Sequence, residues 1–586
     1  MVWLKAILTT ATMQRTGIIK GPLFAHHWPE AIAFLLPLMI ASALLLTYTG
    51  PLNGFWSSDQ GVKLLQVQSL LLNKLSNSAL VYPGAGLDPD DRVNPFQGQY
   101  FRHNGRTYAM FSDAFALVSS IPFFFFGFAG LYLVPMFSLA ALSLTCFRIA
   151  YPILGTGGAL LTALALVLTS PLLFYGVIFW EHMPSTLLVT LALWQALEGN
   201  HRNNQSRFVV AGAAIGVAVW LRNETVLAAP ALIGAVLLTQ RVQALRTACW
   251  IGIGTVAGML PLLIYNQITF GLVTGPHVLV AGAAQYQRAN DPLTMRLAWS
   301  DQLIVPHDEP LLVGAVIAMA LIALITAVRR TSRVTNTGLA LIIVLAIMIS
   351  VLIQMVPRGG LQTALLITFP VVLLCCFPSA PTEQPNLVDA PSILTTFGLI
   401  FIALAWMVPL PDGGAQWGPR MLLPALPALA IAGVWRASSW LRRPMAGAAV
   451  SSAMAIFFFV SLLAQCAGLR QLRDFNIANH TLLTTVAQSK ASVIITDIWY
   501  GPPLLAPIFY DRRMIFLIDD GDDLDYLIER MNTAGFDTVY YLSGRRDSIA
   551  ANTRRWSELT AIGPPVRLAH NLTGQLYRIE ATARSG

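Results

Sequence analysis

Asp59 is the first residue of the sequence whose type and position suggest chemistry. It lies in Ser57-Ser58-Asp59-Gln60, soon after the first long apolar run and at the start of a long polar segment. A carboxylate placed there can take a proton from a hydroxyl group, as a general base does. The alternative role is that of a helix N-cap, which gains from the helix dipole. The acid opens residues 59–75, for which we expect a helix at the membrane surface with Leu64, Val67, Leu71 and Leu75 on one face.

Four more candidate residues lie where apolar runs end. Glu181 and His182 separate two runs, and Glu181 is expected to serve as a helix-start anion, to orient an acceptor or to pair with Arg222. Arg222 and Arg420 either reach toward lipid head groups or bind a phosphate with their bidentate guanidinium groups. The motifs are Phe179-Trp180-Glu181-His182-Met183-Pro184, Trp220-Leu221-Arg222-Asn223-Glu224 and Trp417-Gly418-Pro419-Arg420.

A hairpin is expected over residues 100–108, because aromatic strand-like residues flank Asn104-Gly105, a strong signal for a two-residue turn. The basic residues near its tip either contact an anionic head group or keep the hairpin soluble. We assign Arg106 and Tyr108 of this hairpin to substrate binding. The other residues of that predicted set are Lys63, His182, Arg222 and Arg420.

Two acidic clusters invite a metal assignment, residues 88–91 and 519–525. Neither has the spacing of an EF-hand, and neither has a neighbouring His or Cys. A solvated turn or a helix start explains them better, so we assign no metal ligand and leave a divalent metal open. The sequence also contains no Walker loop, no Rossmann glycine fingerprint and no nucleophile elbow.

The composition is that of a polytopic α-helical membrane protein. Of the 586 residues, 55% are hydrophobic and only 11% are charged, whereas soluble domains carry roughly 25% charge. The net charge of +8 resides mostly in short loops between apolar runs, which indicates topology and argues against a nucleic-acid partner. The five cysteines fall within apolar runs, so a disulfide framework is not expected.

The distribution of Lys and Arg predicts about thirteen transmembrane helices with the N-terminus in the cytoplasm. Residues 113–127 are excluded from this count because they are short for a span and Pro122 interrupts them. The predicted parts are a cytoplasmic tail over 1–29, a transmembrane domain over 30–467 that includes the outside loop 50–130, and an extracytoplasmic domain over 468–586. The predicted spans are 30–49, 131–150, 157–176, 182–198, 208–221, 225–239, 248–265, 310–328, 337–356, 361–378, 392–409, 421–435 and 446–467.

The C-terminal region is expected to be a small soluble α/β domain. Strand-like segments alternate with helical patterns, which favours a largely parallel sheet. The expected strands are 492–497, 514–518, 538–542 and 575–579, and the expected helices are 524–532 and 548–559.

In their order along the chain, these features resemble the GT-C glycosyltransferases, in particular the branch of aminoarabinose transferases and protein O-mannosyltransferases. The shared features are an acid after the first span, a long outside loop, a surface helix ending in an aromatic-Pro run and an acid opening the fourth span. The resemblance covers residues 30–265 best, and the segments 265–271 and 417–424 are similar to ones common in bacterial members. Many members have an acidic pair where this chain has Asp59-Gln60, and an Asp where it has Glu181-His182.

The resemblance implies a reaction outside the cytoplasmic (inner) membrane. The donor would be a polyprenyl-phosphate-linked sugar, and the acceptor a hydroxyl of a glycan, lipid or protein. Asp59 and Glu181 would be the catalytic residues, Asp59 as general base and Glu181 as the second outside acid, and Arg420 with Arg222 would stabilise the leaving phosphate. Displacement at the anomeric carbon from the opposite face would give inversion.

Two alternatives remain at this stage. A transporter or lipid flippase would also explain the spans, although it would usually place ionisable residues near the membrane midplane. A glycan ligase or polymerase of another membrane fold would use the late outside loop 266–309, where the candidate residues are His277, Arg288, Arg296 and His307.

Overall fold

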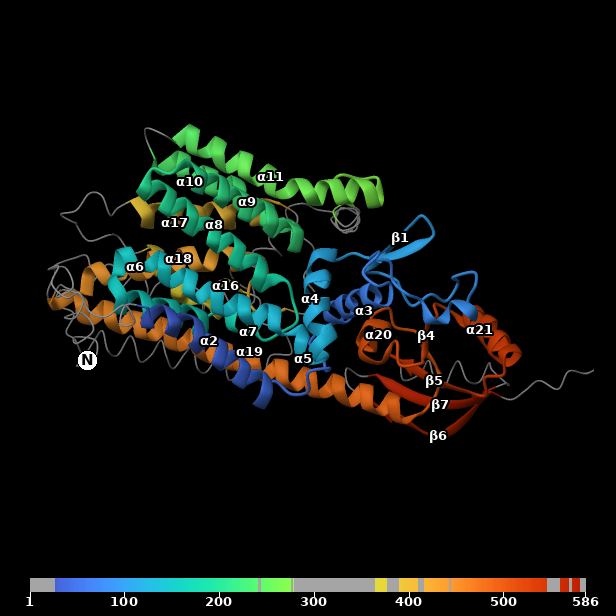
Figure 1. The fold of residues 1–586 in the computed structure, drawn as a ribbon. Coiled ribbons are helices and arrows are strands. Elements are labelled where there is room, and N and C mark those ends of the chain that lie inside the picture. Colours follow the sequence, from blue (N-terminus) through green and yellow to red (C-terminus); the bar gives the residue numbers. More distant parts are fainter. Residues whose placement is uncertain are drawn as a thin grey trace, which may run out of the picture. The chain divides into compact units, whose positions relative to one another are not determined.

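The computed structural model describes residues 27–240, 244–275, 278, 364–376, 389–408, 416–441, 444–544, 559–568 and 572–579 (Figure 1). The chain divides into two compact units. The first contains Met1–Leu44 and Tyr132–Leu469, and the second contains Leu45–Leu131 and Arg470–Gly586. The second unit therefore joins the predicted outside loop to the C-terminal region.

The first unit is helical. Within the described residues, six helices are long and apolar enough to cross a membrane, which fits the multi-pass architecture predicted from composition. The spans expected at 310–328 and 337–356 lie outside the described residues. The helices that carry the first unit are α2 (Trp28–Thr47), α6 (Leu133–Thr169), α7 (Pro171–Gly176), α8 (His182–Arg202), α9 (Gln205–Leu221), η4 (Asn223–Leu227), α10 (Ala228–Thr239), α11 (Ala244–Phe270), α16 (Leu365–Thr368), η5 (Pro370–Cys376), α17 (Asp389–Met407), η7 (Arg420–Ala425), α18 (Leu426–Leu441) and α19 (Pro444–Gln488).

Two local breaks divide apolar runs of this unit. Gly155 has non-helical dihedral angles (φ 71°, ψ 175°) inside α6, at the gap predicted between the spans 131–150 and 157–176. The predicted span 361–378 is interrupted in its described part, where α16 ends and η5 begins around Phe369. Phe369 precedes Pro370, and the proline ring disfavours helical geometry at the preceding residue.

Small residues hold α9 against α11, two helices that run side by side in Figure 1. Gly212 and Gly216 of α9 face Gly254 and Gly258 of α11, and a Cβ atom added at any of the four would overlap backbone atoms of the other helix. Such four-residue glycine spacing lets two helix backbones approach closely in a membrane. Because Arg222 directly follows α9, this contact fixes where its side chain begins.

The second unit contains two sheets. The predicted hairpin is confirmed: β1 (Tyr100–His103) pairs antiparallel with β2 (Arg106–Ala109), and Asn104 and Gly105 both have positive φ. The other sheet has the strand order β4-β3-β5-β7-β6. Its strands are β3 (Val493–Thr496), β4 (Met514–Leu517), β5 (Thr538–Ser543), β6 (Leu559–Arg567) and β7 (Thr573–Ile579).

This second sheet is mixed, which corrects the expectation of a largely parallel one. The contacts β3–β4 and β3–β5 are parallel, whereas β5–β7 and β7–β6 are antiparallel. The sequence pattern missed β6, whose Gly563-Pro564-Pro565 segment coincides with a register irregularity. The helix α21 (Gly521–Ala534) covers the predicted 524–532, and the helix expected at 548–559 lies outside the described residues except for Leu559, which begins β6.

The outside loop and the C-terminal region share one hydrophobic core. Leu87 and Val93 of the loop are buried with residues of the sheet and of α21. The helix α3 (Ser58–Leu72) belongs to this unit and is buried along most of its length, so Leu64 and Val67, expected on the face of a membrane-surface helix, pack inside the protein instead. A Cβ atom at Gly61 would overlap the carbonyl of Pro503, which shows how closely α3 approaches the C-terminal region.

The predicted boundary near residue 467 falls within a continuous helix. The helix α19 has 45 residues and extends to Gln488, past the predicted span 446–467. The short helix α4 (Asp113–Phe126) matches the predicted non-crossing segment 113–127 and contains Pro122. Its side chains at Phe124, Phe125 and Phe126 are exposed in the structure.

Candidate functional site

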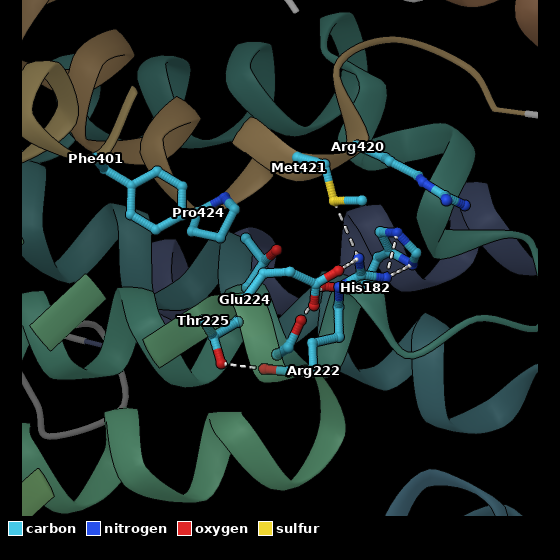
Figure 2. Close-up of a pocket in the computed structure, with 10 residues that line it drawn as sticks. His182, Arg222, Glu224, Thr225, Phe401, Arg420, Met421 and Pro424 are labelled. Carbon is cyan, nitrogen blue, oxygen red and sulfur yellow. Dashed lines mark hydrogen bonds and ion pairs between the residues drawn. The ribbon is translucent and has the colours of Figure 1, made fainter. Parts of the chain in front are cut away.

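Arg222 is the centre of an ion cluster in the first unit (Figure 2). Its Nη1 donates to Glu181 Oε1 at 3.1 Å, and its Nη2 donates to Glu224 Oε1 at 2.6 Å. The Nη2 atom also lies 3.3 Å from the sulfur of Met421. The three charged side chains are 10%, 8% and 19% exposed, for Arg222, Glu181 and Glu224 respectively. The predicted pairing of Glu181 with Arg222 is therefore present in the structure.

The electrostatics of this cluster favour the charged form of Arg222. Burial acts to lower the pKa of Arg222, but the carboxylates of Glu224 and Glu181 outweigh that effect and raise the pKa above its ordinary value. The cation is thus held by two anions. With Arg420 included, two carboxylates and two guanidinium groups balance in formal charge.

His182 lies against the same guanidinium group. Nη1 of Arg222 is 2.6 Å from Nε2 and 3.1 Å from Nδ1 of His182. An arginine has no acceptor atom, so the histidine nitrogen accepts in this contact. The imidazole also stacks on Tyr175, with ring centroids 4.8 Å apart, and contacts Trp180 at 4.9 Å. His182 is therefore fixed by packing as well as by hydrogen bonding.

Arg420 begins η7 and projects into the same region. Its guanidinium carbon lies 5.3 Å from the centroid of the Trp180 ring, within the range of a cation–π contact. The preceding Gly418 has φ +64°, and a Cβ atom there would press against Pro171. Trp417 is buried and donates its indole N–H to Gln465 Oε1 at 3.3 Å. The glycine and the tryptophan together fix the turn from which Arg420 extends.

A small cavity lies among these side chains. It is lined by His182, Arg222, Glu224, Arg420 and Met421, among others, and has a volume of about 10 Å³ (Figure 2). That volume holds roughly one water molecule. A phosphate group would therefore need these side chains to move apart before it could bind.

Asp59 belongs to the second unit and lies in the first turn of α3. The N-cap of this helix is Ser57, and Gln60 Oε1 accepts hydrogen bonds from the backbone N–H of Trp56 at 2.8 Å and of Ser57 at 3.3 Å. The alternative role of Asp59 as the N-cap is thus wrong. Its Oδ1 accepts a hydrogen bond from Gln99 Nε2 at 2.7 Å, and the side chain is half-buried. A carboxylate has several acceptor sites on its two oxygens, so one that accepts from an amide can also accept a hydroxyl proton.

The other predicted binding residues of this unit differ in accessibility. Lys63 is buried, with Nζ 3.4 Å from the ring centroid of Phe111. Tyr108 is also buried and stacks on Phe101 at 5.6 Å. Arg106 is exposed next to the hairpin turn. Of the three, only Arg106 presents its charged group at the surface of the unit.

The structure thus brings together Glu181, His182, Arg222 and Arg420, and places Asp59 and Arg106 in the other unit. Sequence reasoning missed three contributors: Glu224, Trp180 and Gln99. Glu224 lies in the motif 220–224 and Trp180 in the motif 179–184, close to predicted residues. The negative charge of Glu224 and the aromatic ring of Trp180 could therefore have indicated their roles. Gln99 lies far from Asp59 in the sequence, and no pattern marked it.

One acid in each acidic cluster has a structural role. Asp88 is buried and accepts hydrogen bonds from Tyr82, from the N–H of Arg92 and from the N–H of Val93. Asp520 caps α21 by accepting from the N–H groups of residues 522 and 523. Among the residues that the structure describes, no three His, Cys, Asp or Glu side chains gather as metal ligands would.

The chain is similar to known membrane glycosyltransferases. Residues 114–265, less than half of the chain, match the model of a family described as dolichyl-phosphate-mannose-protein mannosyltransferase. No curated protein matches the chain in sequence. The structure of ArnT from Cupriavidus metallidurans bound to undecaprenyl phosphate is similar with a TM-score of 0.51 at 12% identity, over 94% of this chain and 98% of that one.

The apo oligosaccharyltransferase of Archaeoglobus fulgidus is also similar, with a TM-score of 0.47 at 12% identity, over 88% of this chain and 70% of that one. At such low identity, the similarity to ArnT concerns the fold. The polytopic GT-C-like fold with a C-terminal α/β region, predicted from the sequence, is confirmed by it.

Proposed function

We propose that this protein is a membrane glycosyltransferase of the GT-C type that uses a polyprenyl-phosphate-linked sugar. The enzyme class rests on the family match over 114–265 and on the fold shared with ArnT. The description of the matching family names dolichyl-phosphate-mannose, and the ArnT structure contains undecaprenyl phosphate. The donor assigned here is of the same chemical class.

The observation that carries the donor assignment is the position of Arg420. Its guanidinium group is buried at the start of η7, rests on Trp180 and lines a cavity with Arg222 and Glu224. A planar guanidinium with a fixed stem can bind a phosphate through two parallel hydrogen bonds. Arg420 is therefore the contact we assign to the phosphate of the donor.

Arg222 receives a different role from the one its sequence position suggested. Each of its Nη atoms is bonded to a carboxylate, and one also faces His182. A phosphate would have to displace one of these anions to bind it. Arg222 therefore acts as a positioning residue that keeps Glu181 and His182 in place, and Glu181 is its counter-ion.

The chemical step is a single displacement. Asp59 takes the proton of the acceptor hydroxyl as its oxygen bonds to the anomeric carbon. The bond between that carbon and the phosphate oxygen breaks, and the electron pair leaves with the polyprenyl phosphate. The Arg420 guanidinium stabilises the charge that develops on the phosphate. Attack and departure on opposite faces of the sugar invert the anomeric configuration.

We assign the reaction to the extracytoplasmic face of the cytoplasmic membrane, with the N-terminus inside and the C-terminal domain outside. The charge distribution of the loops supports this orientation. The acceptor is a hydroxyl of a glycan, a lipid or a protein. No nucleotide is required on that face, because the donor carries its own leaving group.

The test uses the full-length protein in proteoliposomes with a polyprenyl-phosphate sugar and envelope acceptors from a deletion strain. Mass spectrometry should find a glycosylated acceptor and an equal amount of free polyprenyl phosphate, and NMR should find the inverted anomer. A lipid-linked sugar that appears unchanged on the opposite leaflet, without a covalent product, would instead identify a flippase. A product with retained configuration would contradict the single displacement.

A further inference from the structure

The second unit contains a larger cavity that the proposed reaction does not yet use. It has a volume of about 390 Å³ and is built from residues 73–107 of the outside loop. Cavities of roughly 300–1,000 Å³ are typical of sites for small ligands. Its lining combines amides, a carboxylate, two guanidinium groups and aromatic rings.

The walls of this loop cavity carry three asparagines whose orientations are fixed. Asn73 Nδ2 donates to Asn77 Oδ1 at 3.1 Å and to the carbonyl of Ala79 at 2.8 Å. Asn94 Nδ2 donates to Asp91 Oδ1 at 3.1 Å, and its own oxygen accepts from the N–H of Phe96 at 2.8 Å. Amide and carboxylate groups held in this way can bond to neighbouring hydroxyl groups without a further loss of rotamer freedom.

Two aromatic rings, Tyr82 and Phe96, line the same cavity. Their centroids lie 6.0 Å apart in an edge-on arrangement. The hydroxyl of Tyr82 is held by the buried carboxylate of Asp88 at 3.0 Å, and Phe96 packs on Tyr100 at 5.2 Å. Rings anchored so firmly give an apolar surface of the kind on which the C–H face of a pyranose packs.

The two arginines of the cavity come from the hairpin. Arg102 forms an ion pair with Asp91. The guanidinium group of Arg106 forms no hydrogen bond or ion pair with any residue that the structure describes. The turn at Asn104-Gly105, with φ of 50° and 72°, fixes the pairing of the two strands and hence the position of Arg106. A guanidinium without a protein partner at the edge of a polar cavity suits an anionic group of a ligand.

We propose that this cavity binds an anionic carbohydrate. The amides and Asp91 bond to the sugar hydroxyls, the rings of Tyr82 and Phe96 pack on the sugar face, and Arg106 binds a carboxylate or phosphate carried by the sugar. In the glycosyltransferase proposed above, on which this identification rests, the carbohydrate is part of the acceptor. The cavity would then distinguish acceptors by their negative charge. A neutral hydroxyl group alone would not allow this distinction.

The direct test measures binding without any donor. Full-length protein in phosphatidylcholine nanodiscs is titrated with three sets of oligosaccharides: neutral, carboxylate-bearing and phosphate-bearing. We expect one of the anionic sets to bind at least tenfold more tightly than the neutral set, and the better one identifies the source of the negative charge. Equal binding of all three sets, or no binding, would overturn the proposal.

Two variants locate the binding in the cavity. Arg106→Gln should weaken the binding of the anionic oligosaccharide about tenfold, as expected for one charge-assisted contact. Arg512→Gln is the matched control, because Arg512 is also exposed in this unit and does not line the cavity. Equal binding by both variants would show that the anion is bound elsewhere.

A transfer assay separates this proposal from the enzymatic one. If Arg106→Gln raises the acceptor KM and leaves the donor KM unchanged, both proposals stand. If transfer occurs and Arg106→Gln changes neither constant, the acceptor site is wrong while the function stands. If no transfer is found but Arg106→Gln still weakens oligosaccharide binding, the site stands and the function fails.

Discussion

Both units contain an arginine paired with a carboxylate, but the pair is buried in the first unit and exposed in the second. In the first unit, Arg222 is 10% exposed and bonded to Glu181 and Glu224, which are 8% and 19% exposed. In the second unit, Arg102 is 54% exposed and its partner Asp91 is 27% exposed. A buried ion pair cannot lose one partner without stranding the other charge, whereas water readily replaces the partner of an exposed one. We infer that the buried cluster serves mainly to hold side chains in place, and that the exposed pair can exchange its partner for a ligand.

Neutralising the buried cation should have the largest effect on stability. Arg222→Gln should destabilise the protein by about 3–5 kcal/mol, because two carboxylates would remain buried without their partner. The measurement is thermal inactivation of the detergent-solubilised protein, followed by loss of monodisperse protein in gel filtration. A variant as stable as the wild type would show that the cluster is solvated and not a rigid support.

A second prediction concerns the helix contact that sets the position of Arg222. Gly212→Ala should cost about 1–3 kcal/mol, because its Cβ atom would push α9 away from α11. Gly252→Ala is the matched control, since nothing lies near a Cβ atom at that position of α11. The same inactivation assay compares the two, and equal stability of both variants would exclude close helix contact as the support of the cluster.

The third prediction separates Arg420 from Arg222 by function. Arg420→Lys keeps the positive charge but loses the planar fork, so binding of undecaprenyl phosphate should weaken about tenfold while stability changes little. Tryptophan fluorescence can follow the titration because the guanidinium lies on the Trp180 ring. Unchanged affinity for undecaprenyl phosphate would remove Arg420 from the donor site.

The smallest expected effect is on the exposed pair. Arg102→Gln should change stability by about 0–1 kcal/mol, the usual range for surface ion pairs. This variant is the counterpart of Arg222→Gln in the same inactivation assay. A loss as large as that of Arg222→Gln would erase the distinction between the two regions.

The sequence predicted features that depend on local chemistry. The hairpin followed from Asn104-Gly105, and the strand segments 493–496, 514–517 and 538–543 followed from their apolar runs. The break within residues 361–378 was not predicted because apolar composition outweighed the constraint that Pro370 places on Phe369. The strand β6 was not predicted because its glycine and prolines are untypical of a strand.

Features that depend on long-range packing could not be predicted. The burial of α3 arises from contacts such as Gly61 against Pro503, which are distant in sequence. The hydrogen bond from Gln99 to Asp59 likewise joins residues that are distant in the sequence. Arg222 was assigned to the phosphate because it is a basic residue at a span end, but the structure bonds it to both Glu181 and Glu224.

Single-turnover transfer by Asp59→Asn is the most direct test of Asp59 as the general base. The rate should fall by about 10²–10⁴, the usual contribution of general-base catalysis, with undecaprenyl phosphate binding and thermal stability unchanged. Asp525→Asn, an exposed acid of the same unit, is the control and should transfer at the wild-type rate. Transfer by Asp59→Asn within a few-fold of the wild-type rate would show that Asp59 is not the general base.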